Sequence, residues 1–276
     1  METFGERLHA AVAERGPLCV GIDPHAALLS RWGLPDDVSG LERFARTVVE
    51  AVADRVAVLK PQSAFFERFG SRGVAVLEST IRQSKEAGAL VLLDVKRGDI
   101  GSTMAAYADA YLNPASTLCS DAITVSPYLG VGSLAPAFES AAAHGGGVFV
   151  LALTSNPEGP AVQHAVGAGG RTVAQTVIDE ISQVNAGARP LGSLGLVVGA
   201  TIGETGHDLS AVNGPLLAPG LGAQGGTPDD LRAVFGESLH NVLPSYSREV
   251  LSAGPSIADL RAATERVLDG VRTALG

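Results

Sequence analysis

Residues 91–103 read VLLDVKRGDIGST, and this stretch passes from an apolar run into a cluster of charged residues. The run at 91–93 is typical of a strand covered on both faces, as parallel strands are. Asp94 and Lys96 are two residues apart, so in a strand their side chains leave from the same face, while Leu93 and Val95 take the other face. The stretch therefore predicts a parallel strand that places the Asp94 carboxylate and the Lys96 amine on the same face at one end of a sheet.

The same alternation continues along the whole chain of 276 residues. Strand-like runs occur at 18–23, 55–60, 89–96, 121–126, 147–154, 194–200, 215–220 and 240–245, and amphipathic helical patterns at 41–55, 71–88 and 171–185. Strands alternating with helices predict an α/β fold, and eight units predict a closed (β/α)8 TIM barrel that takes residues 1–276 as a single domain. An open doubly wound sheet is the alternative, but the first strand ends in GIDP and not in the GxGxxG typical of that fold.

Two connecting segments stand out between these units. Residues 156–170, NPEGPAVQHAVGAGG, are expected to be a loop, and the sequence does not indicate its role. Residues 203–214, GETGHDLSAVNG, are expected to form a short helix with turns.

Composition excludes several classes of protein. The net charge is -9 without a basic block, which argues against a nucleic-acid partner. No apolar segment reaches the roughly 18 residues that span a bilayer, and the N-terminus lacks the apolar core of a signal peptide, so we expect a cytoplasmic protein without a membrane partner. Two cysteines and six histidines show no disulfide or metal-ligand spacing, and we expect all the histidines to be solvated.

Polar residues follow the predicted strands at their C-terminal ends, where barrels of this kind hold their chemistry. They are Asp23 after the first strand, Lys60 after the second, Asp94 and Lys96 on the third, Thr154 and Ser155 after the fifth, Gln224 after the seventh and Arg248 after the eighth. Asp99 lies just beyond the third strand. A buried ion pair with a helix N-cap at Asp99 is the structural alternative to a catalytic role for Asp94 and Lys96.

A second constellation is the glycine-rich stretch 218–227, APGLGAQGGT. Its glycines leave backbone N–H groups free to approach an anion, and Thr227 followed by Pro228 predicts a helix start. A helix N-terminus after the seventh strand is a common phosphate site in barrels, and Arg248 is placed to close it. The alternative is a flexible glycine linker.

These residues resemble a known family. The run from Asp94 to Thr103 resembles the D-x-K-x-x-D-[IV]-x-x-T signature of orotidine 5'-monophosphate decarboxylases. APGLGAQGG is similar to the phosphate loop of that family, and Ser247 with Arg248 to its strand-eight motif. The resemblance covers essentially the whole chain and is strongest to a longer bacterial variant, although SNPEG and SYSRE depart from the usual pattern.

The resemblance implies a homodimer that converts orotidine monophosphate to uridine monophosphate and carbon dioxide, the last step of UMP synthesis, without cofactor or metal. It implies catalytic roles for Lys60, Asp94 and Lys96, together with Asp99 from the other subunit. Lys96 would protonate the carbanion left by decarboxylation, and acids beside it would favour its charged form. The implied substrate-binding residues are Asp23, Ile100, Thr103, Ser155, Gln224, Gly225, Gly226 and Arg248, of which Ile100 and Thr103 reach across the dimer.

Two alternatives to this function remain at this point. One is a magnesium-dependent sugar-phosphate lyase with the same D-x-K-x-x-D pattern, which is expected to carry an acid where Lys60 stands. The other is a barrel that binds nucleotides without catalysis.

Overall fold

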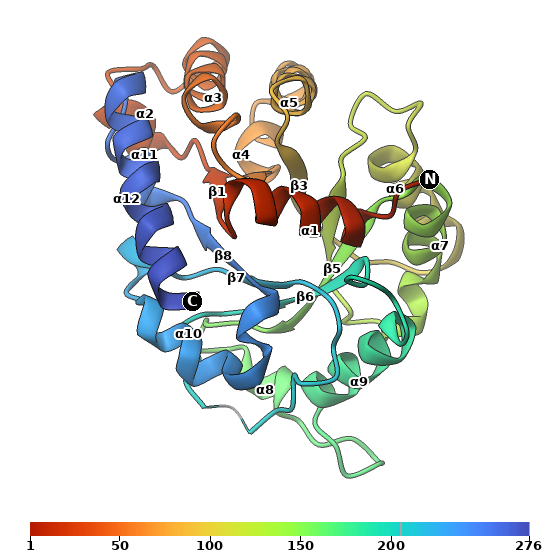
Figure 1. Ribbon diagram of the computed structural model, residues 1–276. Helices are drawn as coiled ribbons and strands as arrows, with labels where there is room; N and C mark the ends of the chain where they lie inside the picture. Colours follow the sequence, from red (N-terminus) through yellow and green to blue (C-terminus); the bar gives the residue numbers. More distant parts are fainter. Residues whose placement is uncertain (205, 276) are drawn as a thin grey trace.

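The chain folds as a closed barrel of eight parallel strands in sequential order, with helices on the outside (Figure 1). This computed structural model describes residues 1–204 and 206–275. The strands are β1 Cys19–Ile22, β2 Val58–Pro61, β3 Leu90–Arg97, β4 Ala122–Val125, β5 Gly147–Leu153, β6 Leu194–Val198, β7 Leu216–Ala218 and β8 Val242–Tyr246. Pairing of β1 with β8 closes the sheet, so the barrel is confirmed and the open sheet is excluded.

The α-helices of the described residues lie around the barrel, except α1, which lies across one end of it (Figure 1). They are α1 Phe4–Arg15, α2 Ala26–Arg31, α3 Val38–Val52, α4 Ala64–Glu67, α5 Gly70–Glu86, α6 Gly101–Leu112, α7 Ala135–His144, α8 Pro160–Gln163, α9 Val173–Asn185, α10 Pro228–Phe235, α11 Arg248–Leu251 and α12 Ile257–Leu275. The three predicted helical patterns correspond to α3, α5 and α9. Among the described residues, no helix is both long and apolar enough to cross a membrane.

The connection between β6 and β7 differs from the prediction. Apart from residue 205, which lies outside the described residues, 203–214 contains turns and no helix. Gly203 and Gly206 adopt positive φ angles, and the Asp208 carboxylate accepts a hydrogen bond from the Ser210 amide at 2.9 Å. Local turns of this kind compete with helix formation, which explains why the prediction was wrong. Residues 156–170 contain α8 in addition to the expected loop.

The inner face of the barrel changes from apolar to polar along β2, β3, β4 and β8, and stays apolar along β5, β6 and β7. The part nearest the starts of the strands is an apolar cluster that includes Leu92, Ala122, Phe149 and Val197. Because side chains alternate between faces, the residues two positions further along these strands also point inward. On β3 that residue is Asp94, so the strand that buries Leu92 in the core presents a carboxylate one layer above it.

Helix α1 lies across the barrel in Figure 1 and covers the end at which the strands begin, which we call the lower end. Phe4 and Leu8 belong to the inner apolar cluster, and the Phe4 ring meets Phe149 edge to face at 5.9 Å. A Cβ at Gly147 would lie 2.3 Å from the Phe4 ring, so only glycine allows this close approach. The lower end is thus filled by packing, and the upper end is the one open to a ligand.

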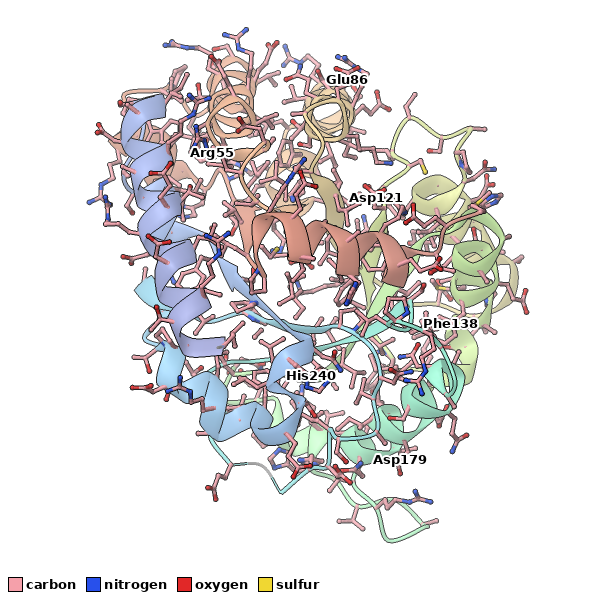
Figure 2. The ribbon with its side chains drawn as sticks, in the orientation of Figure 1. Arg55, Glu86, Asp121, Phe138, Asp179 and His240 are labelled. Carbon is pink, nitrogen blue, oxygen red and sulfur yellow. The ribbon has the colours of Figure 1, made fainter. Side chains whose placement is uncertain are left out.

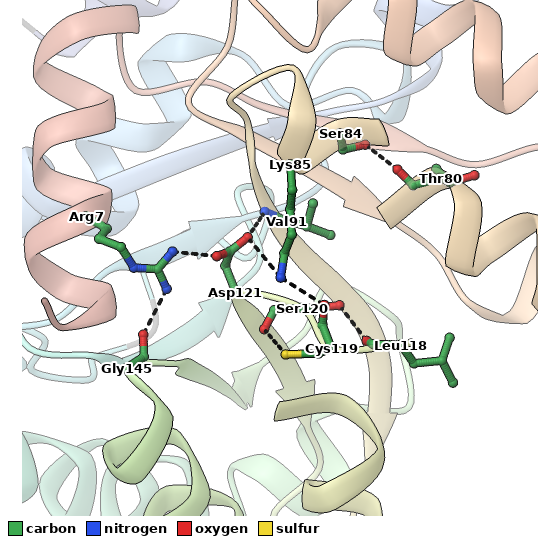
Figure 3. Close-up of polar contacts among 10 residues, drawn as sticks. All are labelled: Arg7, Thr80, Ser84, Lys85, Val91, Leu118, Cys119, Ser120, Asp121 and Gly145. Atoms are coloured by element: carbon green, nitrogen blue, oxygen red, sulfur yellow. Dashed lines mark hydrogen bonds and ion pairs between the residues drawn. The ribbon is translucent and has the colours of Figure 1, made fainter. Parts of the chain in front are cut away.

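One ion pair and hydrogen bonds around it fix α1 in this place. Asp121 precedes β4 and lies beside α1 (Figure 2). Arg7 donates to the Asp121 carboxylate and, at 2.8 Å, to the Gly145 carbonyl (Figure 3). The Val91 amide donates to the other Asp121 oxygen at 2.8 Å, which joins the network to β3. This network is at the opposite end of the barrel from the polar layer, so its contribution is to stability.

Candidate active site

A cavity of about 600 Å³ opens at the C-terminal ends of the strands. This volume is typical of small-molecule sites. Its wall is apolar along β5, β6 and β7, through Leu151, Leu153, Val197 and Leu217, and polar along the remaining strands. Of the residues predicted from the sequence, it is lined by Asp23, Lys60, Asp94, Lys96, Thr154, Ser155, Gln224 and Arg248.

Asp94 is the centre of the polar wall. Lys60 Nζ lies 3.1 Å and Gln62 Nε2 3.1 Å from its Oδ2 atom. Lys96 Nζ lies 2.6 Å and Thr124 Oγ1 2.7 Å from its Oδ1 atom. A carboxylate has about four acceptor positions, so these donors use its full capacity and fix its orientation.

The electrostatics of this group follow from its burial and its neighbours. Burial by itself would raise the pKa of Asp94, but the charges of Lys60 and Lys96 and the hydrogen bonds from Lys96 and Thr124 hold it well below the usual range. Burial opposes the charge of Lys60 as well, yet Asp94 and Asp23 raise the pKa of Lys60 above its usual value. Both groups are therefore charged at neutral pH.

The two lysines differ in access. The Lys60 side chain is only 9% exposed, whereas the Lys96 side chain is 45% exposed toward the cavity. Lys60 therefore binds Asp94 from a buried position in the barrel wall, and Lys96 is the lysine whose ammonium group a ligand can contact.

The opposite side of the cavity suits an anion. Arg248 begins α11 directly after β8 and lines the cavity, and within residues 1–204 and 206–275 it makes no ion pair. Gln224 lines the same part of the cavity. Thr227 caps α10 as predicted, with its side chain accepting a hydrogen bond from the Asp230 amide.

The glycine-rich stretch differs from the prediction in one respect. Its amides are not free, because Gly225 N–H donates to the Gly222 carbonyl at 2.7 Å and Gly226 N–H to the Gly220 carbonyl at 3.0 Å. A Cβ at Gly226 would lie 2.6 Å from that same Gly220 carbonyl, so the turn requires glycine there. These two amides reach an anion only if the loop rearranges.

Other predicted residues lie outside the cavity wall. These are Asp99, Ile100, Thr103, Gly225 and Gly226. Asp99 is not the N-cap of α6, a position held by Ile100, and its carboxylate accepts a hydrogen bond from the Ile100 amide at 2.8 Å. Ile100 is 61% exposed.

The wall also contains residues that were not predicted, among them Gln62, Thr124 and His25. Gln62 and Thr124 bind Asp94, and His25, expected to be solvated, lines the cavity with its ring edge-on to Phe65. A signal for Gln62 was available, since it lies two residues after Lys60 and so on the same face. Thr124 lies between apolar residues in the predicted strand DAITVS, and threonine is a common residue in strands, so nothing in the sequence distinguished it.

The arrangement places an exposed ammonium, fixed by a buried carboxylate, between an apolar wall and an arginine. Such a site binds a planar or apolar group and an anionic tail, and it stabilises negative charge that develops beside Lys96. Within the described residues, no cluster of histidine, cysteine or acidic side chains has the arrangement of a metal site.

Comparison with known proteins gives consistent matches over the whole chain. The sequence model of the "Orotidine 5'-phosphate decarboxylase / HUMPS family" matches residues 16–263. A Salinispora arenicola protein named orotidine 5'-phosphate decarboxylase is 79% identical over 275 residues, covering 100% of this chain and 99% of that protein. Its Streptomyces coelicolor counterpart is 64% identical over 276 residues, covering 100% and 99%. A crystal structure from Streptomyces avermitilis is similar with a TM-score of 0.97 at 62% identity, covering 100% of this chain and 96% of that one.

Proposed function

This chain belongs to the orotidine 5'-phosphate decarboxylase / HUMPS family, and we propose that it converts orotidine 5'-monophosphate to uridine 5'-monophosphate and carbon dioxide. The observation that carries this proposal is the chain of contacts Lys60–Asp94–Lys96 in one cavity with Arg248. The experiment that tests it is incubation with orotidine monophosphate while the pyrimidine absorbance is followed. Uridine monophosphate is the expected product, and an unchanged spectrum would contradict this proposal and leave the sugar-phosphate lyase and the nucleotide-binding barrel as the alternatives.

Lys96 is the proton donor in this proposal. Breaking the bond between pyrimidine C6 and its carboxylate releases carbon dioxide and leaves the electron pair on C6. The Lys96 ammonium stabilises that charge and transfers a proton to C6, and the neutral amine then regains a proton from water. Asp94 holds Lys96 in place and lies beside the departing carboxylate, where its charge disfavours the bound reactant.

The groups that do not react supply binding energy. Arg248 and Gln224 bind the phosphate, joined by the amides of Gly225 and Gly226 once the loop opens its internal hydrogen bonds. Asp23 accepts hydrogen bonds from ribose hydroxyls, and Ser155 contacts the pyrimidine. Binding energy gained at the phosphate drives loop closure over the reacting ring.

The same proposal includes a homodimer. Ile100, Tyr128 and Leu129 are 61%, 80% and 52% exposed, and we call these three residues the rim patch. Its two loops adjoin, since the Ser126 amide donates to the Arg97 carbonyl at 2.8 Å. Burial of the rim patch against a second copy would carry Asp99, Ile100 and Thr103 of one chain toward the cavity of the other, completing the charged chain around Lys96.

Mixing two inactive variants tests the shared site. A Lys96→Ala chain retains Asp99, and an Asp99→Asn chain retains Lys96. If the subunits exchange, about half of the dimers are mixed and each has one intact site of two, so about a quarter of full activity should return. No recovery from subunits shown to exchange would place Asp99 in its own chain's site, and a monomer in sedimentation would exclude the shared site.

The alternative function is a sugar-phosphate lyase, for which magnesium is the expected cofactor. The Lys60 ammonium occupies Asp94 Oδ2 at 3.1 Å, where it competes with a divalent cation for that oxygen. We therefore expect undiminished turnover of orotidine monophosphate in EDTA. Loss of turnover that magnesium restores would favour the magnesium-dependent lyase.

A further inference from the structure

Lys96 has a backbone conformation that is unusual for its residue type. Its φ angle is +45°, in the left-handed region, where a side chain with a Cβ atom is unfavourable. Such conformations persist where the surrounding structure holds them, and they occur often at functional sites. The contacts that hold Lys96 therefore bear on its chemistry.

The pairing of β3 with β4 is interrupted at this residue. Leu92 pairs with Ala122 and Leu93 with Ile123, but the next pair is Arg97 with Val125. Three residues of β3 thus stand against Thr124 alone. The Lys96 amide donates to Thr124 Oγ1 at 3.0 Å, so a side chain replaces the carbonyl acceptor of a regular ladder.

The Thr124 hydroxyl also reaches the carboxylate that binds Lys96. A backbone amide only donates and a carboxylate only accepts, so the hydroxyl accepts from Lys96 and gives its own proton to Asp94 Oδ1, 2.7 Å away. The same Oδ1 atom accepts from Lys96 Nζ at 2.6 Å. These three bonds form a closed ring through Lys96, Thr124 and Asp94.

We propose that Thr124 is a positioning residue, whose hydroxyl fixes the backbone of Lys96 and thereby aims its ammonium at the reacting carbon. Thr124 is 1% exposed, so water does not compete for the two bonds. Gln62 does not duplicate this role, since it binds Asp94 Oδ2 and not Lys96. The inference rests on the proposed function of Lys96 as proton donor.

Thr124→Val removes the hydroxyl and keeps the branched shape. Misplacing a catalytic group by about 1 Å costs about 10²-fold in rate, so we expect kcat to fall by about 10- to 100-fold. KM and the affinity for uridine monophosphate should stay within about threefold, because Arg248 and Gln224 are untouched. Thr124→Ser restores the hydroxyl and should keep kcat within about threefold of the wild type.

Thr264→Val is the matched control. Thr264 is fully buried in α12, and its hydroxyl donates to the Leu260 carbonyl at 2.8 Å, so the variant loses a buried hydroxyl away from the cavity. It should change neither kcat nor KM. If Thr124→Val does not fold, Thr124→Ala removes the hydroxyl with a smaller side chain, and folding is checked by circular dichroism and uridine monophosphate binding.

The outcomes separate this inference from the proposed function. A wild-type protein that does not decarboxylate orotidine monophosphate overturns both. With an active wild type, a normal kcat in folded Thr124→Val, or an equal loss in Thr124→Ser, overturns the positioning role and leaves the decarboxylase intact. A lower melting temperature with normal kcat would show that Thr124 contributes only to stability.

Discussion

Replacing Asp94 by asparagine keeps the shape of the side chain and removes its charge, and we expect a loss of about 3–5 kcal/mol in the free energy of unfolding. Asp94 is 6% and Lys60 7% exposed, so water screens neither charge well. At 3.1 Å and an effective dielectric constant of about 20, two unit charges attract by about 5 kcal/mol. The variant leaves the buried Lys60 with Asp23 as its remaining acidic neighbour and without its hydrogen-bonded partner, so most of this attraction should appear as lost stability.

The ion pair of Asp94 with Lys96 contributes less to the expected loss in the free energy of unfolding. Its Nζ atom is 2.6 Å from Asp94 Oδ1, but its side chain is 45% exposed. Solvent screening limits such a pair to about 1 kcal/mol or less. The expected loss therefore comes mainly from Lys60.

Urea denaturation is the assay, and Glu86→Gln is the control. The Arg82–Glu86 pair has the same 3.1 Å separation, but its side chains are 60% and 61% exposed. Its loss should cost only about 0.3–0.5 kcal/mol. A Lys60→Met/Asp94→Leu double variant should recover much of the stability, because it leaves no unpaired buried charge.

The pH dependence of stability is an independent test of the contribution of Asp94. The pKa of Asp94 is lowered in the folded protein, so its contribution is present above the unfolded pKa of about 3.9 and is lost as the pH falls through the folded value. The difference between wild type and Asp94→Asn should be full at neutral pH and shrink in acid. A loss at neutral pH no larger than that of Glu86→Gln would refute a tightly coupled buried pair.

Three further predictions concern binding, pH and stability. Arg248→Ala should raise KM by about 10- to 100-fold, the worth of a charge-assisted hydrogen bond, with kcat changed much less; a normal KM in steady-state kinetics would remove Arg248 from the phosphate site. Lys60→Met removes one of the cations that lower the pKa of Asp94, so the acid limb of the kcat/KM profile should move to higher pH, and an unmoved limb would argue against this coupling. Phe4→Ala should cost about 3–5 kcal/mol of stability in urea denaturation and leave kcat unchanged in the folded fraction, because α1 packs at the other end of the barrel; a large fall in kcat would contradict that separation.

The barrel and the charged centre followed from simple periodicities. Apolar runs alternating with helical patterns predicted the eight strands, and the spacing of Asp94 and Lys96 predicted that both would reach the cavity. This worked because the period of two along a strand is a local property of the backbone. Asp94 itself lies above Leu92 on the inner face, as that period requires.

The remaining features depend on contacts between distant segments. The irregular pairing at Lys96 and the hydroxyl of Thr124 arise between two strands, and no pattern within either strand reports them. The amides of Gly225 and Gly226 were expected to be free, but the turn that the glycines permit uses these amides internally. For 203–214, turn-forming glycines outweighed the helical pattern around the buried Leu209 and Val212.

The most direct test is turnover by Lys96→Ala with uridine monophosphate binding measured on the same sample. We expect decarboxylation to fall by at least about 10³-fold, since proton donation and charge stabilisation are both lost, while the product still binds through Arg248 and Gln224. A near-normal kcat in this variant would contradict the role of Lys96 as proton donor.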